Sequence, residues 1–294
     1  MKKIGTLGCV FLAGLLSAVT LPLYGEIRIL AITSAANFAT GTLLPGSLAS
    51  VFCTGLQVPA LATPDGMPLP RTLAGVKVTV QGVDAPILAI ASLAGGTYQQ
   101  INVQLPWELP VSLTSPAYGV VTQGDASGHF LWSGFTGLWP VFFSNVAGYA
   151  VAQHASDLRL VTPADPARPG EWIAVYATNL GPVANQPADG YPAPTQPLAA
   201  VAPTPTSYRY YFGPVVGDSG SYTSTRLASN YMGLVPGLAG LYQVNVQVPG
   251  GQPSGDLVFQ IVDLWDCGFF FSQSCGRSLV TAAASMAAKI PVGN

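Results

Sequence analysis

The amino-acid sequence predicts an all-β protein made of two tandem immunoglobulin-like β-sandwiches. Three observations lead to this fold class: an internal repeat, a high content of turn-forming residues, and short segments in which apolar and polar side chains alternate. The 294 residues include 33 glycines and 26 prolines. Such a density of helix-breaking residues favours many short strands joined by turns.

The repeat consists of two ordered matches. Residues 45–56 (PGSLASVFCTGL) return as residues 169–180 (PGEWIAVYATNL), and residues 100–106 (QINVQLP) return as residues 243–249 (QVNVQVP). The first pair is offset by 124 residues and the second by 143, so the second copy is 19 residues longer between its landmarks. Two matches in the same order indicate two related structural units.

The N-terminal segment has the layout of a secretory signal. Lys2 and Lys3 precede an uncharged, apolar run over residues 4–24, as the charged and hydrophobic regions of a signal peptide do. Cleavage would follow Ala18 or Gly25. The alternative is a retained membrane anchor, because a run of this length could span a bilayer. We expect export to the extracellular space, the cell surface or the periplasm, with no membrane span after cleavage.

The expected organisation follows from the repeat and the signal. Residues 1–25 form the signal peptide, residues 26–137 the first sandwich, and residues 138–294 the second sandwich with an insertion. Strands are expected where the repeat is apolar on both faces or alternates with a period of two. The last strand is expected to begin at Ser278, although the alanine-rich sequence that follows also favours a helix.

Two asparagines interrupt the alternating strands at equivalent positions. Asn102 and Asn245 each stand between two apolar residues of the repeated segment. Their side chains could bond backbone groups at a bulge or between the two units, or they could occupy exposed positions of the ladder.

Three cysteines remain after the signal. Cys267 and Cys275 are close in sequence, and an exported protein meets an oxidising compartment, so we expect them to close a loop as a disulfide. Cys53 is left over. The second copy has Ala177 at that position, which indicates a buried small residue rather than a reactive thiol.

Charge and spacing exclude several function classes. Only 8% of residues are charged, with a net charge of −2, against about 25% charged residues in a typical protein. A chain without a basic stripe is not expected to bind nucleic acid. The cysteines and the two histidines, His129 and His154, do not have metal-ligand spacing. We therefore expect no metal and no cofactor.

One segment points to catalysis. Residues 217–220 (GDSG) look like the nucleophile segment of chymotrypsin-type proteases, and the sequence around His154 is similar to their histidine segment. A triad also needs an orienting carboxylate, which no spacing identifies. Ser219 is better explained by a hairpin turn, so a hydrolase is only the third functional hypothesis and no catalytic residue is expected.

Aromatic residues give the best candidate binding site. Trp265 lies beside the expected disulfide loop, and Phe269, Phe270 and Phe271 lie within it. Aromatic faces suit stacking on sugar rings or on an apolar partner. A second aromatic group at residues 208–212 is better explained as sandwich core.

The repeated motifs also resemble a known family. The chain is similar to a domain, often C-terminal, of acidobacterial (Solibacter-type) exported proteins of uncharacterised function. The matching motifs are AANF at 35–38, LPGS at 44–47, GVKVTV at 75–80, QINVQLPWE at 100–108, PARPGE at 166–171, YATNLG at 176–181 and PGLAGLYQVNV at 236–246. The resemblance implies immunoglobulin-like folds and supplies no catalytic residues. The chain departs from the family at Cys53 and in the Cys267–Cys275 insertion.

Together these observations predict a secreted or cell-surface structural or adhesive module without catalytic activity. Its partner would be an unknown protein or polysaccharide at the cell surface. The first alternative is a carbohydrate-binding module that uses the exposed aromatic residues.

Overall fold

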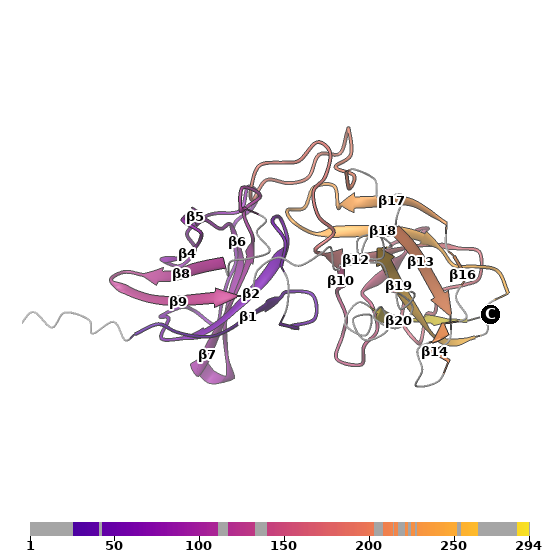
Figure 1. Cartoon of the computed structure of the whole chain (residues 1–294). Coiled ribbons are helices and arrows are strands. Elements are labelled where there is room, and N and C mark those ends of the chain that lie inside the picture. The colour runs from indigo at the N-terminus through magenta and orange to yellow at the C-terminus, as the bar shows by residue number, and fades with distance from the viewer. Residues whose placement is uncertain are drawn as a thin grey trace, which may run out of the picture.

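The chain is described here by a computed structural model. The described residues are 26–40, 43–110, 117–132, 140–202, 208–213, 215–216, 221–222, 225–226, 228–251, 254–263 and 287–293. Their secondary structure is strands and one short 3-10 turn, η1 (Ala94–Gly96). The predicted all-β fold is therefore confirmed. Figure 1 shows the strands gathered into two lobes.

The first lobe contains two antiparallel sheets. Its strands are β1 (Arg28–Ser34), β2 (Leu48–Thr54), β3 (Leu61–Ala62), β4 (Val76–Val80), β5 (Val83–Asp84), β6 (Ile87–Leu93), β7 (Tyr98–Gln104), β8 (Ala117–Gln123) and β9 (Ala126–Trp132). One sheet has the order β1-β2-β7-β6-β3 and the other the order β5-β4-β8-β9.

The second lobe repeats this plan. Its strands are β10 (Val141–Phe142), β11 (Ala152–His154), β12 (Trp172–Thr178), β13 (Tyr208–Gly213), β14 (Val215–Val216), β15 (Ser221–Tyr222), β16 (Thr225–Arg226), β17 (Ser229–Leu234), β18 (Tyr242–Gln247), β19 (Gly255–Asp263) and β20 (Ala287–Val292). One sheet has the order β10-β12-β18-β17, with β11 also paired to β12. The other has the order β16-β13-β19-β20, and β14 and β15 form a separate pair.

The strand order of both lobes is that of an immunoglobulin-like sandwich. Such a sandwich has strands A, B, E and D in one sheet and strands C, F and G in the other. In the first lobe β1-β2-β7-β6 corresponds to A-B-E-D and β4-β8-β9 to C-F-G. In the second lobe β10-β12-β18-β17 and β13-β19-β20 have the same order. The predicted immunoglobulin-like class therefore follows from the topology.

The two repeated motifs are strands B and E of each lobe, and they pair with the same register. Leu48 of β2 faces Gln104 of β7, and the equivalent Trp172 of β12 faces Gln247 of β18. Strands B and E are central neighbours in one sheet, so the two repeated motifs form one paired unit in each lobe.

Each lobe buries an apolar cluster between its sheets. In the first, Val51 and Ile101 come from one sheet and Val78 and Val121 from the other, and all four are fully buried. A second cluster fills the other lobe in the same way, around Tyr242 and Phe259. The predicted period-two alternation placed Val78 and Ile101 at such inward positions, and the segment that contains Val51 was expected to be apolar on both faces.

Cys53 lies in the first core. Its side chain has 0% exposure and is a free thiol. The interpretation of Cys53 as a buried small residue is thus confirmed, and burial raises the pKa of its thiol to about 12.

Several predictions fall outside the described residues. They concern the signal segment 1–25, the boundary near residue 137, and the 264–286 region with its expected disulfide and aromatic loop. The last strand is observed as β20, while the predicted start at Ser278 also lies outside the described residues.

In the described part of the chain, the Asn102 side chain is bonded to side chains of its own sheet. Its Oδ1 accepts hydrogen bonds from Ser50 Oγ at 2.7 Å and from Gln100 Nε2 at 2.8 Å. It therefore belongs to a half-buried side-chain ladder across β2 and β7. In contrast, Asn245 Oδ1 is buried with no hydrogen-bond partner in the described part of the chain.

Candidate functional site

The candidate site is the contact between the two sandwiches together with the adjoining loop of the first. One part of the contact joins the start of β2 to the end of β12. Asn179 Oδ1 accepts hydrogen bonds from Leu44 N–H at 2.6 Å and from Ser47 Oγ at 2.8 Å. Thr178 Oγ1 accepts a third, from Leu48 N–H at 2.8 Å. These side chains are buried, so the bonds lie away from competing water.

The second part of the contact is a loop of the second sandwich, residues 186–191, hereafter the Asp189 loop. Gly190 N–H donates to Gln104 Oε1 at 2.8 Å, and Leu69 N–H donates to the Gly190 carbonyl at 2.8 Å. The Asp189 side chain is 1% exposed, and its Oδ1 accepts a hydrogen bond from Trp107 N–H at 2.9 Å. Figure 1 shows the region after β12 reaching towards the first lobe near β6.

The surroundings of the Asp189 carboxyl disfavour its ionised form. Burial raises its pKa to about 6, and the nearby Glu108 carboxyl adds to this rise. Arg71 Nη2 lies 3.7 Å from Asp189 Oδ2 and opposes the rise in pKa. The Arg71 side chain is itself 44% exposed, so it compensates the buried charge only in part.

The Trp107 ring packs directly against Gly46 at the contact between the lobes. A Cβ atom on Gly46 would lie 2.1 Å from the Trp107 ring. Gly46 also has φ +77°, a region that other residues rarely adopt. The ring packs against the core of the second sandwich, so this glycine lets the two lobes approach closely.

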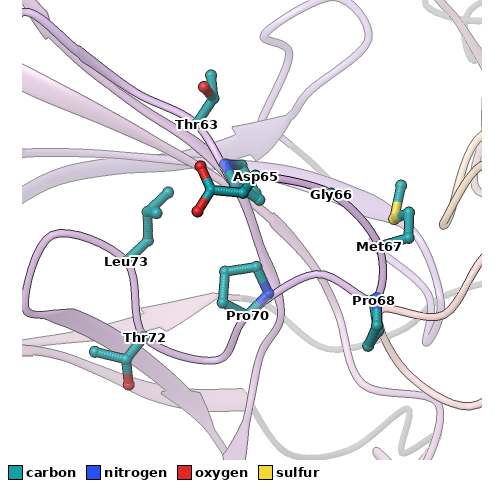
Figure 2. A pocket seen from close by; sticks show the side chains of 9 residues that line it. Thr63, Asp65, Gly66, Met67, Pro68, Pro70, Thr72 and Leu73 are labelled. Atoms are coloured by element: carbon teal, nitrogen blue, oxygen red, sulfur yellow. The ribbon is translucent and has the colours of Figure 1, made fainter.

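A hollow of about 530 Å³ lies on the loop between β3 and β4. Its lining residues are Thr63, Pro64, Asp65, Gly66, Met67, Pro68, Pro70, Thr72 and Leu73. Figure 2 shows the Asp65 carboxylate extending towards Leu73 above the Pro70 ring. The hollow thus offers proline and aliphatic surface beside one carboxylate and two threonine hydroxyls.

The hollow and the contact between the lobes share one loop. Leu69 and Arg71, which hold Gly190 and Asp189, stand within the same 63–73 segment that lines the hollow. The second sandwich therefore helps to fix the shape of this loop.

His154 has a structural environment. It is 2% exposed, its Nδ1 lies 3.0 Å from Glu171 Oε1, and its Nε2 lies 3.7 Å from Asp165 Oδ2. Both carboxylates belong to the connection between β11 and β12, so the imidazole ties that connection to the strand. Ser219, the other residue of the hydrolase hypothesis, lies outside the described residues.

The predicted binding residues are not placed by the structure. Trp265, Phe269, Phe270 and Phe271, and the predicted disulfide partners Cys267 and Cys275, all lie outside the described residues. The sequence did not single out the contact residues as a site, because Asp189-Gly190 reads as a turn and Gln104 as a strand residue.

The described ranges contain neither a metal-binding cluster nor a membrane-spanning helix. No group of three or more histidine, cysteine or acidic side chains there could hold a metal ion. In the same ranges, no helix has the length and apolar character to cross a membrane.

Neither a protein-family model nor a curated protein matches the chain. Solved structures similar to it include a titin Ig tandem, at 11% identity over 85% of this chain and 90% of that chain with a TM-score of 0.20. Bovine butyrophilin is 9% identical over 92% of this chain and 100% of that chain, with a TM-score of 0.22. A serine-rich repeat adhesion glycoprotein from Streptococcus agalactiae is 10% identical over 92% and 96%, with a TM-score of 0.17. These TM-scores are too low to carry an argument, so the fold assignment rests on the strand order.

Proposed function

We propose that the protein is an exported, cell-surface interaction module that binds a partner without chemical turnover. The observation that carries this proposal is the shared loop of residues 63–73, whose hollow is exposed while Leu69 and Arg71 anchor it to the second sandwich. A loop held in place before binding loses little conformational entropy when a partner arrives. Binding loops on a rigid sandwich are a common way to build recognition.

The signal-like N-terminus supports export, and the resemblance to acidobacterial exported proteins supports the same location. The predicted disulfide between Cys267 and Cys275 belongs to this proposal, because it requires an oxidising compartment. Mass spectrometry of the exported protein would show the two cysteines linked; free thiols at both would contradict this part of the proposal.

The chemistry of the hollow favours a protein partner. Met67 is 42% exposed, and proline rings line the hollow beside it. When a partner covers exposed apolar surface of this kind, its removal from water stabilises the complex. The Asp65 carboxylate would then accept a hydrogen bond from a lysine or arginine of that partner.

A polysaccharide is the alternative ligand. The oxygens of Asp65, Thr63 and Thr72 around the hollow can bond sugar hydroxyls, and the predicted aromatic loop with Trp265 and Phe270 would add stacking surface. Saturable polysaccharide binding that is lost in Trp265→Ala or Phe270→Ala would favour this alternative.

The test is a binding assay with the exported chain, residues 26–294. It is titrated with cell-surface proteins and with cell-wall polysaccharides, with tryptophan fluorescence as the readout. If the hollow is the site, the double variant Asp65→Asn, Met67→Ala should weaken binding about tenfold or more, the loss of one charged hydrogen bond and one apolar contact. Asp125→Asn, an exposed turn carboxyl between β8 and β9, is the matched control.

Two outcomes would contradict the proposal. Binding unchanged in the double variant would move the site away from the hollow. If the chain hydrolysed a substrate and the Ser219→Ala variant did not, the hydrolase hypothesis would be favoured over the interaction module.

A further inference from the structure

We propose that Asp189 is a proton-controlled latch between the two sandwiches. In this inference the Asp189 loop docks more tightly on the first sandwich when the Asp189 carboxyl is protonated, and less tightly when it is ionised. The latch concerns how the two lobes are held together, so it is independent of what the hollow binds.

The first ground is the position of the carboxyl. Asp189 is buried, with one good hydrogen bond, from Trp107 N–H to Oδ1. Its Oδ2 is buried and has no hydrogen-bond partner among the described residues. A buried carboxylate that is not fully hydrogen-bonded is costly, whereas a neutral carboxyl in the same place costs much less.

The second ground is the set of charged groups that face Asp189. The loop between β3 and β4 contributes Arg71, 3.7 Å away and partly exposed. The segment after β7 contributes Glu108, whose carboxyl interacts directly with that of Asp189. The only other titratable group on the Asp189 loop itself is Tyr191, which is 51% exposed. One cation that is 44% exposed and one opposing carboxyl leave the ionised form of Asp189 poorly compensated.

Protonation resolves this arrangement. The Asp189 Oδ2–H becomes a donor and can bond the Glu108 carboxylate, while Oδ1 keeps the hydrogen bond from Trp107 N–H. The proton comes from solvent, and the ionic attraction between Asp189 Oδ2 and Arg71 Nη2 at 3.7 Å is lost in exchange. The two facing carboxyls then share a single negative charge instead of carrying two.

The third ground is that the rest of this contact is incompletely bonded. Gln104 Nε2 and Trp107 Nε1 are buried without hydrogen-bond partners in the described part of the chain. Each such atom lowers the net stability of the docked form. The free energy that holds the Asp189 loop in its docked position is therefore small. Protonation of one carboxyl is then enough to shift the docking equilibrium.

The direction of the pH dependence follows from the pKa of Asp189. Burial raises this pKa to about 6 when the loop is docked, and a free aspartate titrates near about 3.9. The docked loop therefore binds the proton more tightly than the free loop. Docking is constant above about pH 6. As pH falls from about 6 towards about 4, the docking constant rises by up to about tenfold per pH unit and about 100-fold in all.

Amide hydrogen exchange of the exported chain tests the latch. In the described part of the chain, the N–H groups of Leu69, Trp107 and Gly190 donate the hydrogen bonds that join the loop to the first sandwich. Their protection factors, corrected for the intrinsic pH dependence of exchange, should rise at least about tenfold from pH 7 to pH 5. Core amides such as that of Val244 provide the internal reference.

Three variants separate the latch from a general acid effect. Asp189→Asn should give protection at pH 7 close to the acid level, with no further rise at pH 5. Glu108→Gln removes the facing carboxylate and should move the transition to lower pH. Asp125→Asn should behave as the unmodified chain does. Equal protection at pH 7 and pH 5 in the unmodified chain, or the same transition in the Glu108→Gln variant and the unmodified chain, would overturn the proposal.

Discussion

The two copies of strand B begin in the same way and end in different surroundings. Gly46 N–H donates to the Leu105 carbonyl at 2.9 Å, and the equivalent Gly170 N–H donates to the Val248 carbonyl at 2.8 Å. Both glycines have positive φ, +77° and +87°. Gly46, however, lies beneath the Trp107 ring, while a Cβ on Gly170 would meet nothing within 4 Å.

At the other end of strand B, it is the second copy that contacts the other lobe. Gly55 and Asn179 occupy equivalent positions and both have positive φ, +95° and +69°. A Cβ on Gly55 would lie 2.6 Å from the Glu26 carbonyl oxygen, so no side chain fits there. Asn179 takes up the same backbone conformation, which asparagine tolerates better than most residues. Its amide reaches Leu44 and Ser47 of the first sandwich.

The comparison separates what makes the fold from what joins the lobes. Residues shared by the two copies, such as the Pro-Gly pair and the alternating valines, form the same backbone bonds twice. The contact between the lobes adds residues that the copies do not share, Asn179, Trp107 and Asp189, to shared ones such as Thr178 and Gln104. The contact can therefore be changed by substitutions that leave both sandwiches folded.

The largest effect is expected for alanine at the two glycines. Alanine with positive φ costs about 1 kcal/mol in either place. In Gly46→Ala the overlap with the Trp107 ring adds about 2 kcal/mol, so the free energy of unfolding should fall by about 3 kcal/mol in total. Gly170→Ala, which meets open space, should lose about 1 kcal/mol. Urea unfolding of the two variants measures both values.

Equal losses in the two glycine variants would mean that Trp107 does not constrain Gly46. The distinguishing control is Gly46→Ala combined with Trp107→Ala. Because the smaller side chain removes the overlap, this double variant should lose less than the sum of the two single variants.

The next effect is expected for Asn179→Gly, which copies the residue of the first sandwich into the second. Glycine keeps the positive φ, so backbone strain does not contribute. The substitution removes the acceptor of Leu44 N–H and Ser47 Oγ. Two lost hydrogen bonds predict a loss of about 2 kcal/mol in the docking of the lobes.

Asn185→Gly is the matched control for this variant. Asn185 also has positive φ, +51°, and is exposed. Among the described residues its side chain donates to the Leu198 carbonyl of its own sandwich. Hydrogen exchange at Leu44 and Leu48 should accelerate in Asn179→Gly and stay unchanged in Asn185→Gly. If exchange accelerated in both variants, loss of the hydrogen bonds between the lobes would not explain the effect.

The sequence allowed prediction of the sandwiches but not of their contact, for a physical reason. Period-two alternation reports which face of a strand is buried, so Val76, Val78 and Val80 were placed inward from the sequence alone. The Cys53–Ala177 correspondence predicted burial in the same way. Asp189 carries no such signal, because its role depends on groups 82 to 118 residues away in sequence that only the folded chain brings together.

The smallest effect is expected at Cys53, again as a comparison of the two copies. Cys53→Ala places in the first core the residue that the second core has at Ala177, and removing one buried heavy atom should cost about 1 kcal/mol. The thiol is fully buried and its pKa is raised to about 12, so little reactive thiolate is present near neutral pH. Peptide-level mass spectrometry after iodoacetamide treatment should show Cys53 modified at least about tenfold more slowly in the native chain than in urea. Equal rates in the two conditions would show that strand β2 opens readily, and the first sandwich would then be less stable than its closed core implies.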